Sequence, residues 1–149
     1  MRSCKGSMDV EIKLMHEDAV IPRYESDGAA GFDFSILEDV DVYPGRTYIL
    51  KTGLAFAIPH GFELQIRPRS GTSFKTSLRI ANSPGTIDSD YRGEVGIIVE
   101  NIGEYSIKLE NGDRIAQGVI APVVQGAFKV VEDLSETVRG SGGFGSTGK

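Results

Sequence analysis

Residues 62–67 read Phe-Glu-Leu-Gln-Ile-Arg, a strict alternation of apolar and polar side chains. A period of two is typical of a β-strand with one buried face and one solvated face. On either side of this stretch, from Met8 to Val131, short runs of Val, Ile, Leu, Tyr and Phe are repeatedly interrupted by Gly, Pro, Asn and Asp. No helical period is sustained. The pattern predicts an all-β domain, either a sandwich, a jelly roll or a small barrel.

Short apolar runs between turn residues define the individual strands. The predicted strands are Val10–Met15, Gly31–Ile36, Arg46–Leu50, Leu54–Ile58, Phe62–Arg67, Leu78–Ala81, Val95–Glu100, Tyr105–Lys108, Ile115–Pro122 and Ala127–Val131. Helix is expected only for a turn or so near Gly71–Thr76. Residues 95–99, Val-Gly-Ile-Ile-Val, are apolar on both faces, which predicts either a central position in a sheet or burial against another subunit.

Composition limits the class of protein. The 149 residues, 40% hydrophobic and 25% charged, fit one soluble domain. The single cysteine, Cys4, excludes a disulfide framework and, with only His16 and His60, a Cys/His zinc cluster. We find no membrane-spanning run and no signal peptide, so we expect a cytoplasmic protein with no membrane partner. The net charge of −5 argues against nucleic acid as a partner.

The two ends of the chain differ from the middle. Residues 1–8, which contain a second Met at Met8, resemble a leader added for expression, so the domain is expected to begin at residue 9. Residues 139–149 are rich in glycine, carry cations and lack acids. Their backbone N–H groups can converge on a polyphosphate, Arg139 can supply a bidentate fork, and Phe144 offers a flat face to a base. The alternative is a loose Gly/Ser terminus without a role.

Two polar segments could carry chemistry. Asp33 stands between Phe32 and Phe34, either as a buried, hydrogen-bonded structural group or as an anchor for the water shell of a metal ion. Residues 67–73, Arg-Pro-Arg-Ser-Gly-Thr-Ser, combine guanidinium groups, hydroxyl donors and a turn. They suit a phosphate clamp, but a surface turn with solvated arginines is the alternative.

Two further segments are hairpins. Residues 82–95 form a tight reversal that displays Asp88, which could act as a general base toward water or only stabilise the turn. The free backbone groups of such a hairpin can pair with the edge of a base. Residues 111–117, Asn-Gly-Asp-Arg-Ile-Ala-Gln, form a turn that leads into a strand.

These segments, in this order, resemble the homotrimeric dUTP diphosphatase (dUTPase) family. The motifs that carry the resemblance are AAGFD at 29–33, RPRSG at 67–71, GTIDSDYRGEV at 85–95, GDRIAQ at 112–117 and RGSGGFGSTG at 139–148. The resemblance implies a jelly-roll-like β-barrel or sandwich over residues 9–131 that forms a homotrimer. Residues 132–149 would form a flexible arm that closes over the active site of a neighbouring subunit.

The family also implies the reaction. Family members split dUTP into dUMP and pyrophosphate by attack of water on the α-phosphorus with Mg²⁺, which keeps uracil out of DNA and supplies dUMP for thymidylate synthesis. By resemblance, Asp88 would orient and deprotonate the water. Ser70, with Arg69 and Gly71, would stabilise the charge that develops on the phosphates. Asp33 and Gln117 would hold waters of the Mg²⁺ shell, and the phosphates would be the direct ligands.

Base recognition is implied in the same way. The residues expected to surround uracil and the deoxyribose are Asn82, Gly85, Thr86, Ile87 and Tyr91, with Tyr91 excluding a 2′-hydroxyl. In the arm, Phe144 would stack on uracil, and the residues closing over the γ-phosphate would be Arg139, Gly145, Ser146 and Thr147. One subunit would supply the Asp88 hairpin, a second the Arg69–Gly71 turn and Gln117, and a third the arm.

Two alternatives compete with this assignment. The related dCTP deaminase places a Glu ten residues beyond the hairpin Asp, where this chain has Ile98. An uncharged side chain cannot carry the proton transfers of deamination, so the sequence argues against that reaction. A non-catalytic regulator built on the same fold is the second alternative, and loss of Mg²⁺-dependent turnover would distinguish it.

Overall fold

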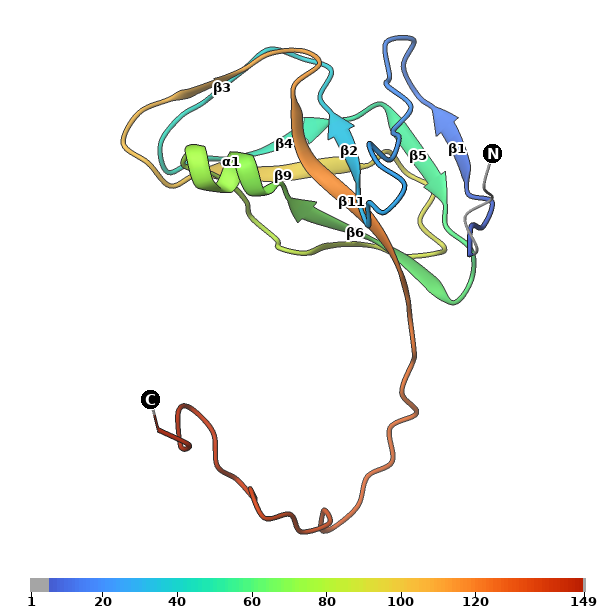
Figure 1. Ribbon diagram of the computed structural model, residues 1–149, viewed down its shortest axis with the longest axis vertical. Helices are drawn as coiled ribbons and strands as arrows, with labels where there is room; N and C mark the ends of the chain where they lie inside the picture. Colours follow the sequence, from blue (N-terminus) through green and yellow to red (C-terminus); the bar gives the residue numbers. More distant parts are fainter. Residues whose placement is uncertain (1–5, 149) are drawn as a thin grey trace.

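Strand β6, Phe62–Pro68, lies inside a four-stranded antiparallel sheet (Figure 1). The computed structural model describes residues 6–148; Cys4, the rest of residues 1–5 and Lys149 lie outside the described residues. The strand order is β2-β11-β6-β8, where β2 is Phe32–Ser35, β11 is Arg114–Pro122 and β8 is Gly85–Ile87. Leu64 and Ile66 are buried, as the alternation in residues 62–67 predicts.

A second sheet packs its side chains into the same core. It has the order β4-β9-β7, with β4 at Thr47–Lys51, β9 at Gly96–Asn101 and β7 at Leu78–Ile80. Two small sheets pair β1 (Glu11–Leu14) with β5 (Leu54–Ala57) and β3 (Val40–Val42) with β10 (Ile107–Leu109). One core cluster includes Phe34, Ile36, Leu50, Leu54, Leu64, Leu78, Ile97 and Val99. The architecture is an all-β jelly roll.

The described residues contain one helix, α1 at Ser70–Lys75, where a single turn was expected. No helix within residues 6–148 is long and apolar enough to cross a membrane. All but one of the predicted strands are present, with ends displaced by one or two residues. The structure adds β3 and β8, which the sequence did not predict.

Two predictions about apolar segments have different outcomes. The doubly apolar strand β9 is central in its sheet, as expected. Its Ile97 and Val99 are fully buried, whereas Ile98 on the other face is only half-buried. The predicted strand Ala127–Val131 is wrong for the isolated chain, since this segment pairs with no strand and Phe128 is 101% exposed. An apolar segment forms a strand only where a neighbouring strand edge can pair with its backbone N–H and C=O groups.

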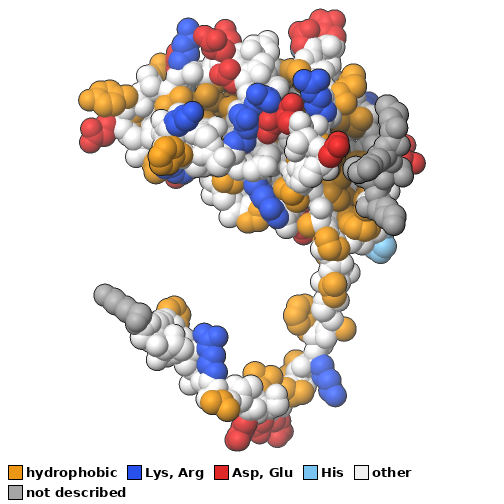
Figure 2. Space-filling model, in the orientation of Figure 1, with side chains coloured by type: hydrophobic (Ala, Val, Ile, Leu, Met, Phe, Trp, Pro, Cys, Tyr) orange, Lys and Arg blue, Asp and Glu red, His pale blue; other side chains and the backbone are white. Residues whose placement is uncertain are grey.

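After β11 the chain leaves the body of the domain. Residues 123–148 extend away from the sheets and curve round without packing on them (Figure 1), and every side chain from Val123 to Val138 is exposed. Figure 2 shows hydrophobic side chains along this arm. They include Val124, Phe128, Val130, Leu134 and Val138. An apolar segment of this length in solvent indicates a surface that requires a partner.

Gly118 of β11 tests the packing of the core. A Cβ atom built there would lie 2.7 Å from ring atoms of both Phe32 and Phe34. Because both rings are buried, Gly118→Ala is expected to lower the free energy of unfolding by about 1–3 kcal/mol in urea denaturation. Gly126→Ala is the control, since no atom lies within 4 Å of its Cβ position. Equal stability of the two variants would contradict this packing.

Candidate functional site

Asp33 lies between two guanidinium groups at one end of the four-stranded sheet. The Nε of Arg69 forms an ion pair with its Oδ1 at 3.1 Å, and Nη1 of Arg114 donates to its Oδ2 at 3.1 Å. The Asp33 side chain is 17% exposed. Each carboxylate oxygen keeps a second lone pair. Asp33 is therefore a hydrogen-bonded structural group that still has acceptor capacity toward a ligand or water.

Gln117 stands beside Asp33 because the two residues pair directly across β11 and β2. Its Nε2 donates to the backbone O of Pro68 at 3.0 Å, which fixes the amide. Its Oε1 lies against Gly31, where a Cβ atom would collide with it. The glycine at position 31 thus leaves the space that the Gln117 amide occupies.

The turn from β6 into α1 presents Arg69, Ser70 and Gly71. The backbone O of Arg69 accepts from Ser73 N at 3.1 Å, and no side chain caps the helix. The N–H groups of the first turn therefore have no acceptor within the helix. Arg69 is also fixed by a bond from Nη1 to the backbone O of Arg114 at 2.9 Å. This arrangement favours an anion clamp over a solvated surface turn.

The hairpin after β7 displays Asp88 at the end of β8. Tyr91 N donates to the backbone O of Asp88 at 3.1 Å, and Nη1 of Arg92 donates to Ser89 O at 2.6 Å. These bonds fix the backbone that carries the Asp88 carboxylate, which is itself exposed. Before β8, Ser83 Oγ donates to Ile80 O at 2.7 Å and closes the reversal.

A cavity of about 240 Å³ opens beside Asp88. The residues that line it are Ile66, Asn82, Gly85, Thr86, Ile87, Asp88, Tyr91, Glu94, Gly96 and Ile98. The hydroxyl of Tyr91 donates to Glu94 O at 3.0 Å, and Gly93 lies against its ring edge, where a Cβ would collide. The sequence-predicted base-binding residues are therefore gathered around one small, partly apolar cavity.

Asp88 also borders a more polar cavity of about 610 Å³. That cavity is lined by His60, Gly61, Phe62, Glu63, Ser89, Asp90, Val123 and Gln125 as well as Asp88. Asp88 thus stands at the beginning of β6, near Phe62, whereas Arg69 and Ser70 follow its last residue, Pro68. A strand of seven residues at about 3.3 Å per residue keeps these groups roughly 20 Å apart. A single chain does not bring the acid and the clamp together.

The predicted residues of the arm lie apart from both groups. Arg139 Nε donates to the backbone O of Gly142 at 2.8 Å within a local turn. Phe144 has a φ of 50° and is 115% exposed. Gly145, Ser146 and Thr147 are likewise exposed. Figure 1 shows the C-terminal end of the arm well away from α1.

Comparison with known proteins identifies this arrangement. A family model for dUTPase matches residues 17–148. The deoxyuridine 5′-triphosphate nucleotidohydrolase of Nautilia profundicola is 51% identical over 142 residues, which is 95% of this chain and 100% of that protein. The chain belongs to the dUTPase family.

Solved structures agree with that assignment. The dUTPase of Staphylococcus bacteriophage 80alpha, solved as a variant with dUpNHpp, has a TM-score of 0.90 and 32% identity, covering 96% of this chain and 100% of that one. A variant dUTPase of phage phi11 of S. aureus, described with a structural Mg(II) ion, has a TM-score of 0.81 and 27% identity, covering 87% of this chain and 100% of that one. The family resemblance seen in the sequence is confirmed.

The donor groups fit a hydrated Mg²⁺ better than a directly bound metal. Within residues 6–148, no three His, Cys, Asp or Glu side chains are grouped as a metal site. The carboxylate that contacts Arg69 of the clamp is Asp33, and the Gln117 amide pairs beside it. Mg²⁺ keeps several waters and binds substrate phosphates, so these oxygens suit its outer shell.

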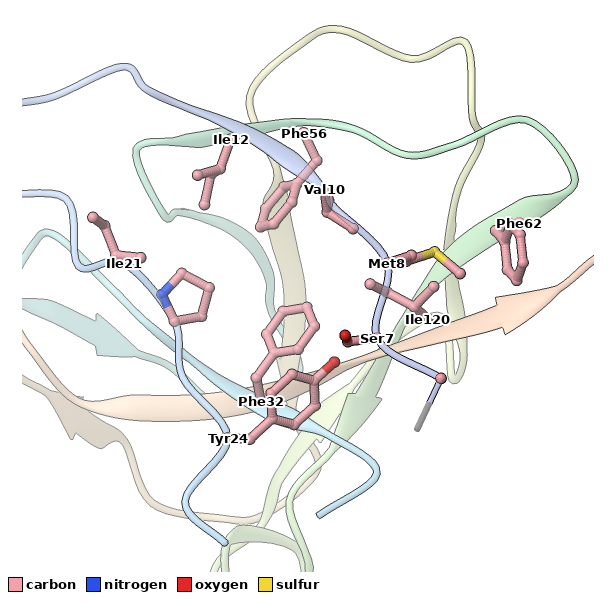
Figure 3. A pocket seen from close by; sticks show the side chains of 12 residues that line it. Ser7, Met8, Val10, Ile12, Ile21, Tyr24, Phe32, Phe56, Phe62 and Ile120 are labelled. Atoms are coloured by element: carbon pink, nitrogen blue, oxygen red, sulfur yellow. The ribbon is translucent and has the colours of Figure 1, made fainter. Parts of the chain in front are cut away.

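An apolar cavity of about 540 Å³ lies elsewhere on the domain. In Figure 3, Tyr24, Phe32 and Phe56 point toward one another beneath β1, and Val10, Ile12, Phe62 and Ile120 border the space. Tyr24 and Phe32 meet edge to face with centroids 5.5 Å apart. Among the described residues, those that line this cavity carry no charge, so they are not suited to holding a triphosphate.

Some residues of the site were not assigned a role from the sequence. Arg114 lies inside the quoted GDRIAQ motif but received no role, and Glu25, which contacts Arg114 at 3.5 Å, lies outside every motif. The arginines whose role the sequence left open have local partners: Arg67 binds Gln65, Arg79 binds Thr76 O and Leu78 O, and Arg92 binds the hairpin. Only the pairing of β11 with β2 reveals the contact of Arg114 with Asp33.

Gly31→Ala tests the position of the Gln117 amide. The added Cβ would displace Oε1 of Gln117. We expect turnover of dUTP, the substrate named in the relatives, to fall roughly tenfold to hundredfold, because small displacements of positioned groups are costly. Gly28→Ala in the same loop meets nothing within 4 Å and serves as the control. Wild-type kinetics in Gly31→Ala would exclude a role for this amide.

Proposed function

We propose that the chain hydrolyses dUTP to dUMP and pyrophosphate as a homotrimer whose active sites are shared between subunits. The observation that carries the proposal is that the acid hairpin and the anion clamp are both fully formed, yet lie at opposite ends of β6. In the cell this reaction keeps uracil out of DNA and supplies dUMP for thymidylate synthesis.

Asp88 is the general base. Its carboxylate is exposed at the rim of two cavities and is carried on a hairpin whose backbone is fixed by hydrogen bonds. It takes a proton from the water whose oxygen forms a new bond to the α-phosphorus. The bond from that phosphorus to the oxygen bridging to the β-phosphate breaks, and pyrophosphate leaves.

Arg69, Ser70 and Gly71 stabilise the charge that develops on the phosphate oxygens. The Arg69 guanidinium is fixed at Nε and Nη1, so its remaining N–H groups are oriented before the substrate arrives. The Ser70 hydroxyl and the free N–H groups at the start of α1 are further hydrogen-bond donors for the phosphate oxygens. Donors fixed in advance stabilise a transition state without reorganising during the reaction.

Asp33 and Gln117 would hold waters of a Mg²⁺ ion that enters with the substrate. Asp33 keeps free lone pairs beside its two arginines, and the Gln117 amide is fixed through Pro68. When bound, Mg²⁺ would neutralise part of the triphosphate charge, with phosphate oxygens as its direct ligands. The side chains of Asp33 and Gln117 would orient its water shell.

The hairpin recognises uracil. Strand β8, Gly85–Ile87, is at the edge of its sheet. Its backbone N–H and C=O groups that do not point toward β6 can therefore pair with a base as a further strand would. Asn82 borders the same cavity. The proposal requires the side chains that line this cavity to leave no space for the methyl group of thymine. Tyr91, held by Glu94, packs on the deoxyribose and excludes a 2′-hydroxyl.

Ile98 argues against deamination of dCTP. Its side chain lines the same cavity as Asp88 and Tyr91, and it stands where the related deaminase requires a Glu. Within the residues that border this cavity, Asp88 and Glu94 are the only acids. Glu94 is occupied by Gly53 N, which donates to its Oε1 at 2.9 Å. Hydrolysis by Asp88 is therefore the better-supported reaction.

Apolar surfaces support assembly into a trimer. Ile49 of β4 is 69% exposed and pairs with the half-buried Ile98 of β9, so the outer face of this sheet has an apolar strip. The arm exposes Val124, Phe128, Val130 and Leu134. Copies of the same chain can cover these surfaces together. Assembly also brings the hairpin of one subunit to the clamp of a second.

The arm completes the site from a third subunit. Phe144 stacks on uracil, and Arg139, Gly145, Ser146 and Thr147 close over the γ-phosphate. All five residues are exposed in the isolated chain, where Arg139 Nε donates to Gly142 O and Ser146 N donates to Gly143 O within local turns. Binding of the triphosphate orders the arm, which then excludes water from the reaction.

Product analysis tests the proposed reaction most simply. Purified protein with Mg²⁺ is incubated with dUTP, dCTP, dTTP or UTP, and phosphate and base products are followed together. We expect dUMP and pyrophosphate from dUTP alone. Ammonia and dUTP from dCTP would overturn the argument from Ile98. No reaction with any nucleotide would favour a binding role for the fold.

Asp88→Asn tests the general base. The amide keeps the size of the side chain but cannot accept the proton, so dUTP binding is retained while kcat falls by roughly 10²- to 10⁴-fold. Steady-state kinetics and calorimetry with dUpNHpp separate the two effects. Near-wild-type kcat in Asp88→Asn would remove this residue as the base.

Truncation before Arg139 tests the arm. Residues 139–148, the described part of the removed segment, make hydrogen bonds only among themselves and with Thr137, so the body should stay folded and oligomeric. We expect kcat/KM for dUTP to fall by roughly 10²-fold or more, because closure over the phosphates is lost. Circular dichroism and sedimentation provide the controls. Unchanged kinetics would make the arm a passive terminus.

A further inference from the structure

Arg114 contacts the phosphate clamp in two separate ways. Its Nη1 donates to Oδ2 of Asp33 at 3.1 Å, and its backbone O accepts from Nη1 of Arg69 at 2.9 Å. The same Nη1 also lies 3.5 Å from Oε1 of Glu25. Arg114 therefore touches both partners of the Asp33–Arg69 ion pair through bonds of its own.

These bonds determine how rigidly Arg69 is held. A long arginine side chain loses considerable rotamer freedom when it is fixed, and a single exposed ion pair barely compensates for that loss. Arg69 is fixed at two edges, by Oδ1 of Asp33 and by the Arg114 backbone. Asp33 in turn has one oxygen on each arginine, so rotation of its carboxylate breaks both bonds. Removing the Arg114 side chain would leave Asp33 with one partner.

The local backbone places Arg114 where it can do this. The pairing of β11 with β2 shifts register between Arg114 and Ala116. Such irregularities redirect a side chain out of the regular ladder and occur next to functional sites. Arg114 is 48% exposed and Asp33 17%, so the bond between them is only partly screened by solvent.

We propose that Arg114 is a positioning residue, which holds the Asp33 carboxylate so that Asp33 fixes Arg69 for phosphate binding. The proposal rests on the proposed function only in taking Arg69 as a phosphate ligand. Arg114 itself need not touch the substrate. Glu25 has a supporting role, because its carboxylate forms a second ion pair with Nη1 of Arg114.

Arg114→Gln is the central variant, and pyrophosphate is the probe. Binding is measured by calorimetry with a chelator present, so that the proposed contact of Asp33 with Mg²⁺ waters does not contribute. We expect pyrophosphate affinity to fall about tenfold. Arg114→Lys should recover most of it, because an ammonium keeps a charged donor near Asp33. Deoxyuridine, which lacks phosphate, should bind both variants as it binds the wild type.

Arg23→Gln is the matched control. Arg23 also pairs with Glu25, at 3.4 Å, but the structure gives it no contact with Asp33 or Arg69. It should therefore leave pyrophosphate binding unchanged. If Arg23→Gln weakens binding as much as Arg114→Gln, general loss of positive charge is the cause, and the positioning role is overturned.

A double-variant cycle tests the route through Asp33. If Arg114 acts through Asp33, then Asp33→Asn combined with Arg114→Gln is no weaker than Asp33→Asn alone. If the double variant instead shows the product of the two single-variant decreases in pyrophosphate affinity, Arg114 acts independently of Asp33, and the proposal is contradicted. Thermal unfolding verifies that each variant folds. If Arg114→Gln does not fold, Glu25→Gln replaces it. We then expect a smaller decrease in pyrophosphate affinity, and an unchanged affinity would contradict the proposal.

The outcomes separate this inference from the proposed function. A wild-type protein that binds pyrophosphate in an Arg114-dependent way but does not turn over dUTP would refute the function and leave the positioning role intact. A wild-type protein that turns over dUTP, together with an Arg114→Gln variant of unchanged pyrophosphate affinity and unchanged KM, would refute the positioning role alone.

Discussion

The length of strand β6 is the constraint on which the site depends. Its backbone hydrogen bonds to β11 and β8 fix it as a rigid spacer, with the Asp88 hairpin beside its first residues and the Arg69–Ser70 turn after its last. The distance of roughly 20 Å between them is far greater than any side chain can span. Under the proposed function, one chain would carry two half-sites that face different neighbours, and the chemistry would require assembly.

The two half-sites use different physical means. The clamp depends on charge: Asp33 is held by two arginines, and Arg69 is fixed before a phosphate arrives. The hairpin depends on shape and on free backbone groups at the edge strand β8, with Gly85 allowing close approach of Asn82 and Ile66. A phosphate chain varies little between nucleotides, whereas the base varies much, so specificity is expected from the hairpin and affinity from the clamp.

The sequence predicted more of the fold than of the contacts. Period-two alternation located β6 because one face of that strand is buried, and an apolar run between turn residues located β11, which is buried on both faces over much of its length. The short strands β3 and β8 were missed. Ala127–Val131 is apolar like a strand but has no partner edge among the described residues of its own chain. Asp33 and Asp88 stood out within motifs, whereas the contact of Arg114 with Asp33 depends on a register shift that no local pattern encodes.

Mixed oligomers test the shared site most directly. Asp88→Asn subunits and subunits truncated before Arg139 are each inactive alone, and they are co-expressed in equal amounts. If a site takes its acid from one chain and its arm from another, random mixing restores about a quarter of the wild-type activity per oligomer, since each of the two required chains is intact in half of the cases. No recovery in oligomers verified to contain both kinds of subunit would contradict the shared site.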